Sequence, residues 1–178
     1  ATVLVNNAAL DDRHELLEMS ETYWDDNQAV NLKPVAFAAQ AVAPGMIAAG
    51  GGAIVNFTST SYMLNIGAMP SYTAAKAGIV GLTKGLAGRL GPDGIRVNAI
   101  APGPFPSKMT AFATATDEGE KATAAMNPLG RIGRPEDIAA LMLFLCGYGG
   151  SYVTGATIPV DGGYSVDTGD RNIFPDFG

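Results

Sequence analysis

The sequence predicts an α/β fold in which a parallel sheet is covered by helices on both faces. Short apolar segments that fit buried strands alternate with longer segments that fit helices. Glycine-rich or proline-containing breaks separate them, as at residues 50–52 and 91–94. Because this alternation is typical of parallel sheets whose crossovers are helices, we expect about four strands.

The expected elements follow one another along the whole chain. We expect strands at residues 2–5, 53–57, 95–100 and 157–160. We expect helices at about residues 20–27, 30–49, 71–90 and 135–146. Ser20 is suited to cap the first helix, and Pro44 is expected to kink the second. Residues 104–128, rich in Ala, Thr and Pro, are expected to form a loose lid.

The amino-acid composition limits the classes of protein to which the chain can belong. The 178 residues fit one domain, and a hydrophobic fraction of 47% with 16% charged residues fits a soluble globular protein. A net charge of −6, without a basic run, argues against a nucleic-acid partner. The single cysteine, Cys146, excludes an internal disulfide. No apolar stretch reaches the roughly 20 residues that span a membrane, and no signal peptide is visible, so we expect a cytoplasmic protein without a membrane partner.

Tyr72 and Lys76 form the first candidate catalytic pair. Four residues apart on an expected helix, they lie on the same face, one turn apart. A nearby ammonium favours the phenolate and lowers the pKa of a tyrosine, so that the phenol can donate or accept a proton near neutral pH. The spacing alone is weak evidence, because such pairs occur by chance.

Polar residues near strand ends strengthen this interpretation. Ser59 comes just after the expected strand at residues 53–57, and the Pro102-Gly103 turn follows the next strand. Asn31 lies near the start of an expected helix. Open parallel sheets bind ligands at the carboxyl ends of their strands, so we expect these residues at one rim of the sheet, beside Tyr72 and Lys76.

In order and spacing, these motifs resemble the classical short-chain dehydrogenases/reductases over residues 2–164. The motifs are Asn6-Asn7-Ala8-Ala9, Asn31, Ser59, Tyr72-x-x-x-Lys76, Asn98-x-x-x-Pro102-Gly103, the run from Gly130 to Asp137, Thr154-Gly155 and Asp161-Gly162-Gly163. The resemblance implies a Rossmann-like doubly wound sheet, an NAD or NADP cofactor, a small alcohol or carbonyl substrate and a homo-oligomer, a dimer or tetramer.

The resemblance also assigns roles to individual residues. It implies Tyr72 as general acid/base, Lys76 as the group that lowers the Tyr72 pKa and binds the nicotinamide ribose, and Ser59 as a hydrogen-bond donor to the substrate oxygen. Asn31 would hold a water that links Lys76 to solvent. Asn7 and Ala8 would lie along the adenosine side of the cofactor. The nicotinamide and pyrophosphate would be bordered by Pro102, Gly103, Phe105 and Ser107.

One departure from the family concerns the cofactor segment. The strand, glycine-rich turn and helix that usually hold the pyrophosphate are not found among residues 1–178, which we expect to correspond to the carboxyl-terminal part of the fold. Gly50-Gly51-Gly52 precedes a strand and is interpreted as a helix stop. We expect a fragment, a chain completed by another polypeptide or a natural short form, and weak cofactor binding by this polypeptide alone. The choice between NAD and NADP is not predicted.

Three further interpretations concern substrate and rival functions. The run Asn7-Ala8-Ala9-x-Asp11-Asp12-Arg13-His14 is similar to that of sugar-oxidising members such as aldose 1-dehydrogenases, which points to a sugar or polyol. Phe105, Met109, Phe112 and Met126 are candidates to line the substrate pocket. Asp11, Asp12, His14 and Glu15 are expected to be a solvated loop, and no metal site is predicted. The alternative to an enzyme is a non-catalytic remnant that acts as an assembly partner.

Overall fold

The computed structural model describes residues 1–10, 14–64, 66–107 and 110–166. Its centre is a four-stranded sheet in the order β1-β2-β3-β4, in which every neighbouring pair is parallel. The strands are β1 (Val3–Asn6), β2 (Gly52–Phe57), β3 (Ile95–Pro102) and β4 (Thr157–Val160). The predicted α/β class and the parallel sheet are therefore confirmed.

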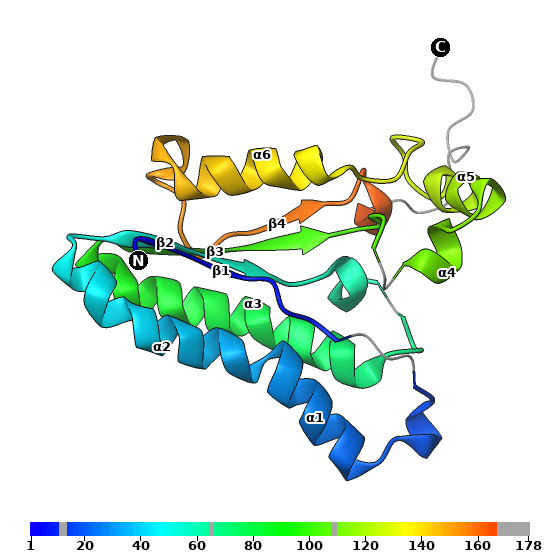
Figure 1. The fold of residues 1–178 in the computed structure, drawn as a ribbon, viewed down its shortest axis with the longest axis horizontal. Helices are drawn as coiled ribbons and strands as arrows, with labels where there is room; N and C mark the ends of the chain where they lie inside the picture. The colour runs from blue at the N-terminus through cyan, green and yellow to red at the C-terminus, as the bar shows by residue number, and fades with distance from the viewer. Residues whose placement is uncertain (11–13, 65, 108–109, 167–178) are drawn as a thin grey trace.

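Helices cover both faces of this sheet (Figure 1). On one face lie α1 (Glu21–Asn31), α2 (Lys33–Ala48) and α3 (Pro70–Leu90), and on the other lies α6 (Pro135–Cys146). Two short helices, α4 (Ala111–Thr114) and α5 (Asp117–Ala125), lie beyond the carboxyl ends of the strands. Short 3-10 turns lie at Leu16–Glu18, Thr60–Tyr62, Gly91–Asp93, Tyr148–Gly150 and Tyr164–Val166.

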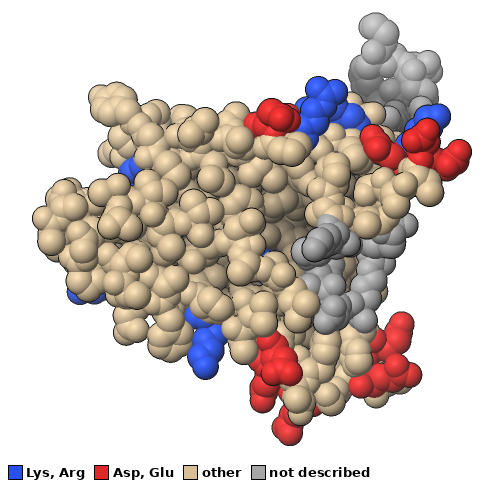
Figure 2. All heavy atoms as spheres, viewed as in Figure 1, with Lys and Arg blue, Asp and Glu red and all other residues tan. Residues whose placement is uncertain are grey.

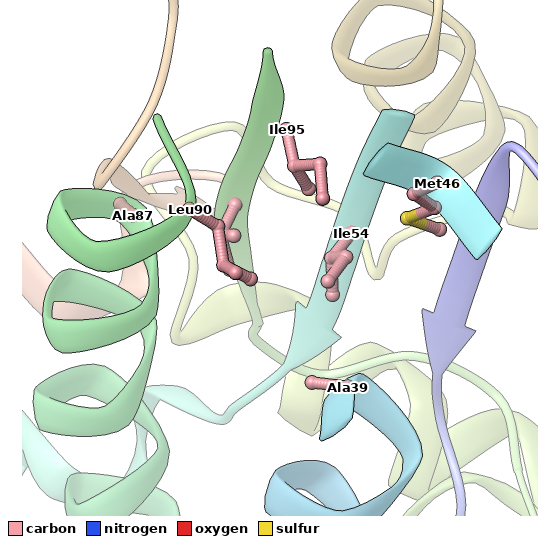
Figure 3. Close-up of a cluster of buried hydrophobic side chains, with 7 residues drawn as sticks. Ala39, Met46, Ile54, Ala87, Leu90 and Ile95 are labelled. Atoms are coloured by element: carbon pink, nitrogen blue, oxygen red, sulfur yellow. The ribbon is translucent and has the colours of Figure 1, made fainter. Parts of the chain in front are cut away.

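Two apolar clusters fasten these layers to the sheet. Between the sheet and helices α2 and α3, the fully buried side chains of Met46, Ile54 and Ile95 form one cluster with the buried residues Ala39, Ala87, Leu90 and Val97 (Figure 3). On the opposite face, the cluster contains Val55, Phe57, Ile100 and Leu145. Burial on both faces explains why β2 and β3 are almost continuously apolar, and it makes the sheet a rigid support for its strand ends.

The helix boundaries differ from the expected ones around Leu32. Helix α1 continues to Asn31, and α2 begins at Lys33 with Pro34 in its first turn. Proline is tolerated at this position because the missing N–H would have no helical partner there. Pro44 lies inside α2, which continues to Ala48.

The lid is more ordered than expected. It contains α4 and α5, and the Thr116 side chain caps α5 by accepting a hydrogen bond from the Gly119 N–H at 3.1 Å. Asp117, Glu118 and Glu120 follow in the first turn, where acidic groups interact favourably with the helix dipole. This capping pattern explains why a segment of weak apolar periodicity is helical.

Charged side chains are unevenly distributed over the surface. On the face shown in Figure 2, Asp and Glu gather over α1 and α5, whereas Lys and Arg form no continuous patch. None of the described helices combines the length and apolar character needed to cross a bilayer. Among the described residues, β1 pairs with β2 alone, so its other side is an edge of the sheet.

Candidate active site

A cavity of about 670 Å³ lies at the carboxyl ends of β2 and β3. Its floor comes from the segments that follow these strands, one wall comes from α3, and the lid helices close the far side. The described residues that line it are Asn7, Ala9, Phe57, Thr58, Ser59, Thr60, Ser61, Ile66, Met69, Tyr72, Lys76, Pro102, Gly103, Pro104, Phe105, Ser107, Thr110, Ala113, Thr114, Thr123, Met126, Ile138 and Tyr164. This size and position fit a small-molecule site at strand ends.

Most of the predicted site residues line this cavity. They are Asn7, Ser59, Tyr72, Lys76, Pro102, Gly103, Phe105 and Ser107. Ala8 is not part of the lining, although it lies between two residues that are. Asn31 is also not part of the lining and lies behind the cavity wall. Of the predicted substrate-pocket residues, Phe105 and Met126 are included, whereas Met109 and the Phe112 side chain lie outside the described residues.

Tyr72 and Lys76 lie in the first two turns of α3, and both are buried. The Lys76 Nζ donates a hydrogen bond to the main-chain oxygen of Phe57 at 2.9 Å and lies 5.4 Å from the centroid of the Tyr72 ring. Burial lowers the pKa of Lys76 from 10.5 to about 8, because the ammonium is removed from water. The Tyr72 phenol and the Lys76 ammonium, whose pKa is lowered, therefore lie together in a buried part of the cavity.

Two hydroxyl groups follow β2 and have different partners. The Ser59 Oγ accepts a hydrogen bond from the Ser61 N–H at 3.1 Å, which leaves its own proton for a second partner. The Thr58 hydroxyl donates to the main-chain oxygen of Lys76 at 2.6 Å and so fastens α3 to the end of β2. Sequence reasoning named Ser59 and missed Thr58, although both carry the same signal, a polar residue directly after a buried strand.

Asn31, the last residue of α1, is fully buried. Its Oδ1 accepts a hydrogen bond from the Leu10 N–H at 3.0 Å, and its Nδ2 donates to the Leu10 carbonyl oxygen at 2.8 Å. This pair of hydrogen bonds holds the main chain just beyond Asn7 and Ala9. Asn31 therefore fixes the position of one cavity wall from behind.

The segment after β3 is held by close contacts. The Gly103 N–H donates to the Val160 oxygen at 3.0 Å, and a Cβ on Gly103 would lie 2.5 Å from the Asp161 Cβ, so only glycine fits. The Ser107 N–H donates to the Thr110 Oγ1 at 2.9 Å, and the Thr110 hydroxyl donates to the Phe105 oxygen. These hydrogen bonds fix the main chain of the segment that contains Gly103, Phe105 and Ser107, which are predicted to contact the cofactor.

The lining contains further residues that sequence reasoning did not single out. Met69 immediately precedes α3, Ile66 precedes it by a few residues, and Tyr164 comes from the turn after β4. Their apolar or aromatic character carries no signal for a site until the fold brings them together. Among the residues that the structure describes, no group of His, Cys, Asp and Glu could hold a metal ion; Asp11 and Asp12 lie outside those residues.

Comparison with known proteins adds a family context to this geometry. Residues 2–165 match the sequence model of a protein family described as enoyl-(acyl carrier protein) reductase. The chain is 45% identical over 161 residues to a protein of Rhizobium meliloti named as a probable galactose dehydrogenase, with 90% of this chain and 63% of that protein covered. It is 47% identical over 163 residues to D-xylose 1-dehydrogenase of Caulobacter vibrioides, with 91% and 65% covered.

A solved structure supports the same relationship. The gluconate 5-dehydrogenase of Burkholderia cenocepacia, crystallised with NADP and tartrate, superposes with a TM-score of 0.87 at 32% identity, covering 93% of this chain and 65% of that one. The chain thus spans slightly less than two thirds of the length of these relatives, at 63% and 65% of the two sequences.

Proposed function

Because the chain belongs to the short-chain dehydrogenase/reductase family, we propose that the protein is an NAD- or NADP-dependent oxidoreductase acting on a secondary alcohol or carbonyl group. The observation that carries the proposal is the gathering of Tyr72, Lys76 and Ser59 around one cavity at the strand ends. A phenol, an ammonium and a hydroxyl in one buried site provide a proton-transfer centre with a hydrogen-bond donor beside it.

Tyr72 acts as the general acid/base at its phenol oxygen. In alcohol oxidation the phenolate takes the proton from the substrate hydroxyl, and in carbonyl reduction the phenol returns it. The nearby ammonium of Lys76 favours the phenolate. The Ser59 hydroxyl, which accepts from the Ser61 N–H, donates its proton to the substrate oxygen as negative charge develops there. Asn31 fixes the wall beyond Asn7, and by the family resemblance it would also hold a water that links Lys76 to solvent.

The cavity fits a nicotinamide cofactor on its strand-end side. Asn7 and Ser107 offer polar groups on this side of the cavity. Gly103 packs closely against Asp161, so the chain presents only main-chain atoms at this position. The residues that would hold the cofactor are Asn7, Ala8, Tyr72, Lys76, Pro102, Gly103, Phe105 and Ser107. A bound nicotinamide supplies or accepts the hydride at the reacting carbon.

A sugar or polyol is the proposed substrate. The curated relatives that support this class are named for galactose and D-xylose. Ser59, Thr60, Thr110 and Thr114 are among the residues that line the cavity. The three threonine hydroxyls donate to main-chain oxygens, so their oxygens remain as acceptors for a substrate that carries several hydroxyl groups. Apolar side chains such as Met69 and Met126 would pack against its carbon skeleton.

The proposal includes the homo-oligomer implied by the resemblance. Apolar side chains are exposed on α6, where Leu143 is 74% and Phe144 is 43% exposed. Covering them in an assembly would remove apolar surface from water. Light scattering coupled to size-exclusion chromatography measures the assembly, and a monomer at micromolar concentration would contradict this part of the proposal.

The decisive experiment is turnover by the purified protein with a panel of neutral aldoses and alditols, at NAD⁺ or NADP⁺ concentrations raised to saturation because weak cofactor binding is expected. Tyr72→Phe is expected to lower kcat at least about 100-fold, the size of a typical general acid/base contribution, while cofactor binding is retained. The matched control is Tyr152→Phe, because Tyr152 is fully exposed and lies outside the cavity. Near wild-type turnover by Tyr72→Phe would remove Tyr72 from the mechanism. Cofactor binding without turnover on any substrate would favour a non-catalytic assembly partner.

A further inference from the structure

Ser71, the residue directly before Tyr72, is held by α1 at both its side chain and its main chain. It is 1% exposed and lies in the first turn of α3. The Gln28 Nε2 donates to the Ser71 carbonyl oxygen and to the Ser71 Oγ, each at 2.9 Å. The Ser71 hydroxyl donates to the Asn27 Oδ1 at 3.2 Å. The start of the helix that carries Tyr72 is therefore tied to α1 by three directed bonds.

The same network continues to the segment after β1, in which Asn7 and Ala9 line the cavity. The Asn31 Nδ2 donates to the Asn27 Oδ1 at 3.2 Å and to the Asn27 carbonyl oxygen at 2.9 Å. Asn31 in turn binds both main-chain groups of Leu10. A continuous chain of hydrogen bonds thus runs from the segment after β1, through α1, to the residue beside Tyr72.

The contact between α1 and α3 costs more folding free energy than would be needed if its only role were to hold the two helices together. The contact of α2 and α3 with the sheet is apolar, as in the cluster of Figure 3. Here buried amides replace apolar side chains, and the buried Asn27 Nδ2 has no hydrogen-bond partner among the described residues. An unsatisfied buried donor costs on the order of 1–3 kcal/mol. The advantage of such a network is geometric specificity, because hydrogen bonds specify one relative position of the groups they join.

We propose that Asn27, Gln28 and Ser71 are positioning residues that hold the Tyr72 phenol in a fixed position relative to the cavity wall formed by Asn7 and Ala9, a role that rests on the proposed function of Tyr72. None of the three lines the cavity among the described residues, so they act through Tyr72 and Asn31 and do not touch a substrate. The network allows α3 little rotation at its first turn. Without it, small displacements of the phenol relative to Lys76 and Ser59 become accessible.

The test compares two hydroxyl deletions that flank Tyr72. Ser71→Ala removes the hydroxyl that joins Gln28 to Asn27. Thr73→Val is the matched control, because the buried Thr73 Oγ1 has no partner among the described residues and valine keeps its shape. We expect Ser71→Ala to lower kcat at least about 10-fold with a substrate KM close to that of Thr73→Val, since misplacement of a reacting group by about 1 Å can cost 100-fold.

A second readout does not depend on turnover. Ultraviolet difference titration against Tyr72→Phe isolates the ionisation of the Tyr72 phenol in the wild type and in each variant. We expect Ser71→Ala to move this titration to higher pH, because a phenol displaced from the Lys76 ammonium loses stabilisation of its phenolate. Asn27→Ala is expected to act in the same direction, and in the double variant the two effects on log kcat are expected to be less than additive.

The outcomes separate the two proposals. An unmoved titration in Ser71→Ala overturns the positioning role, with or without a fall in kcat, because a general loosening of the fold would lower kcat without affecting this group. A titration that moves equally in Thr73→Val also overturns it. Wild-type protein that lacks turnover on every substrate overturns the proposed function, whereas the titration still decides the positioning role. If Ser71→Ala does not fold, Asn27→Ala is measured in its place.

Discussion

The Lys76 ammonium lies 5.4 Å from the centroid of the Tyr72 ring, and both side chains are buried in the same wall of the cavity. The hydrogen bond from Lys76 to the Phe57 oxygen fixes the ammonium at the end of β2. Burial opposes the charge, so that the pKa of Lys76 falls to about 8. The Lys76 ammonium favours the Tyr72 phenolate, but removing this charge from water lowers the stability of the folded protein. This loss of free energy can be measured.

The first prediction concerns stability and pH. The pKa of Lys76 is about 8 in the folded protein, below its value of 10.5 without burial. Below pH 8 the amine is protonated in both states, and the folded state bears the full cost of the buried charge. Between these pKa values the unfolded state binds more protons, so this contribution makes stability rise with pH. Above pH 10.5 the contribution has vanished.

Lys76→Met isolates this contribution. The stability of the wild type relative to Lys76→Met is expected to increase by about 3 kcal/mol between pH 7 and pH 11, at 1.36 kcal/mol per unit of pKa difference. Urea unfolding of both proteins at a series of pH values gives the difference directly. A difference that does not change with pH would mean that the folded and unfolded states hold the Lys76 proton equally well.

The second prediction concerns a buried polar contact between β2 and α3. The Asn56 Nδ2 donates to the Thr83 Oγ1 at 3.0 Å, and the Asn56 Oδ1 accepts from the Asn6 Nδ2 at 2.9 Å. Thr83→Val keeps the shape of the side chain and removes the acceptor, so that a buried amide hydrogen loses its partner. We expect a loss of about 1–3 kcal/mol in the free energy of unfolding.

Chemical denaturation measures this loss, and Thr73→Val again serves as the control because its hydroxyl has no partner among the described residues. The control is expected to keep or raise stability, because valine replaces a buried hydroxyl that has no partner among the described residues. Equal stabilities of the two variants would show that the Asn56 amide finds another partner when Thr83 is replaced. Because Asn6 directly precedes Asn7, weaker cofactor binding by Thr83→Val is also expected.

The strands and the central pair were predictable from the sequence because their signals are local. An apolar run after the glycine break at residues 50–52 predicts β2, and a spacing of four residues places Tyr72 and Lys76 on one face of α3. Ser59 was predictable for the same reason, since strand ends in parallel sheets are ligand sites. Each of these inferences needs only neighbouring residues and one general rule of topology.

The positioning network was not predictable because its partners are far apart in the sequence. Ser71 and Asn27 are separated by 44 residues and meet only after α1 packs on α3. In the sequence, Ser71 is an ordinary polar residue at the start of a helix. The small helix α5 was missed for a different reason: its apolar periodicity is weak, although the Thr116 cap and the acidic first turn were available as signals.

The last prediction concerns Gly133, which lies against the lid side of the cavity. Its N–H donates to the Pro104 oxygen at 2.9 Å, and a Cβ at this position would overlap the ring of Phe105. Because Phe105 lines the cavity, Gly133→Ala forces the ring to rotate, and the space available for a ligand changes. We expect a loss of stability of about 1–3 kcal/mol from the overpacking, together with an increase in substrate KM.

The control for Gly133→Ala is Gly91→Ala, since Gly91 has helical dihedral angles and nothing lies within 4 Å of a Cβ built there. Alanine at this position is expected to be neutral or stabilising by up to about 1 kcal/mol, because it reduces the freedom of the unfolded chain. Thermal unfolding and steady-state kinetics of the two variants give both quantities. If Gly133→Ala loses stability while its KM stays at that of Gly91→Ala, the Phe105 ring has turned away from the cavity and does not shape the substrate site.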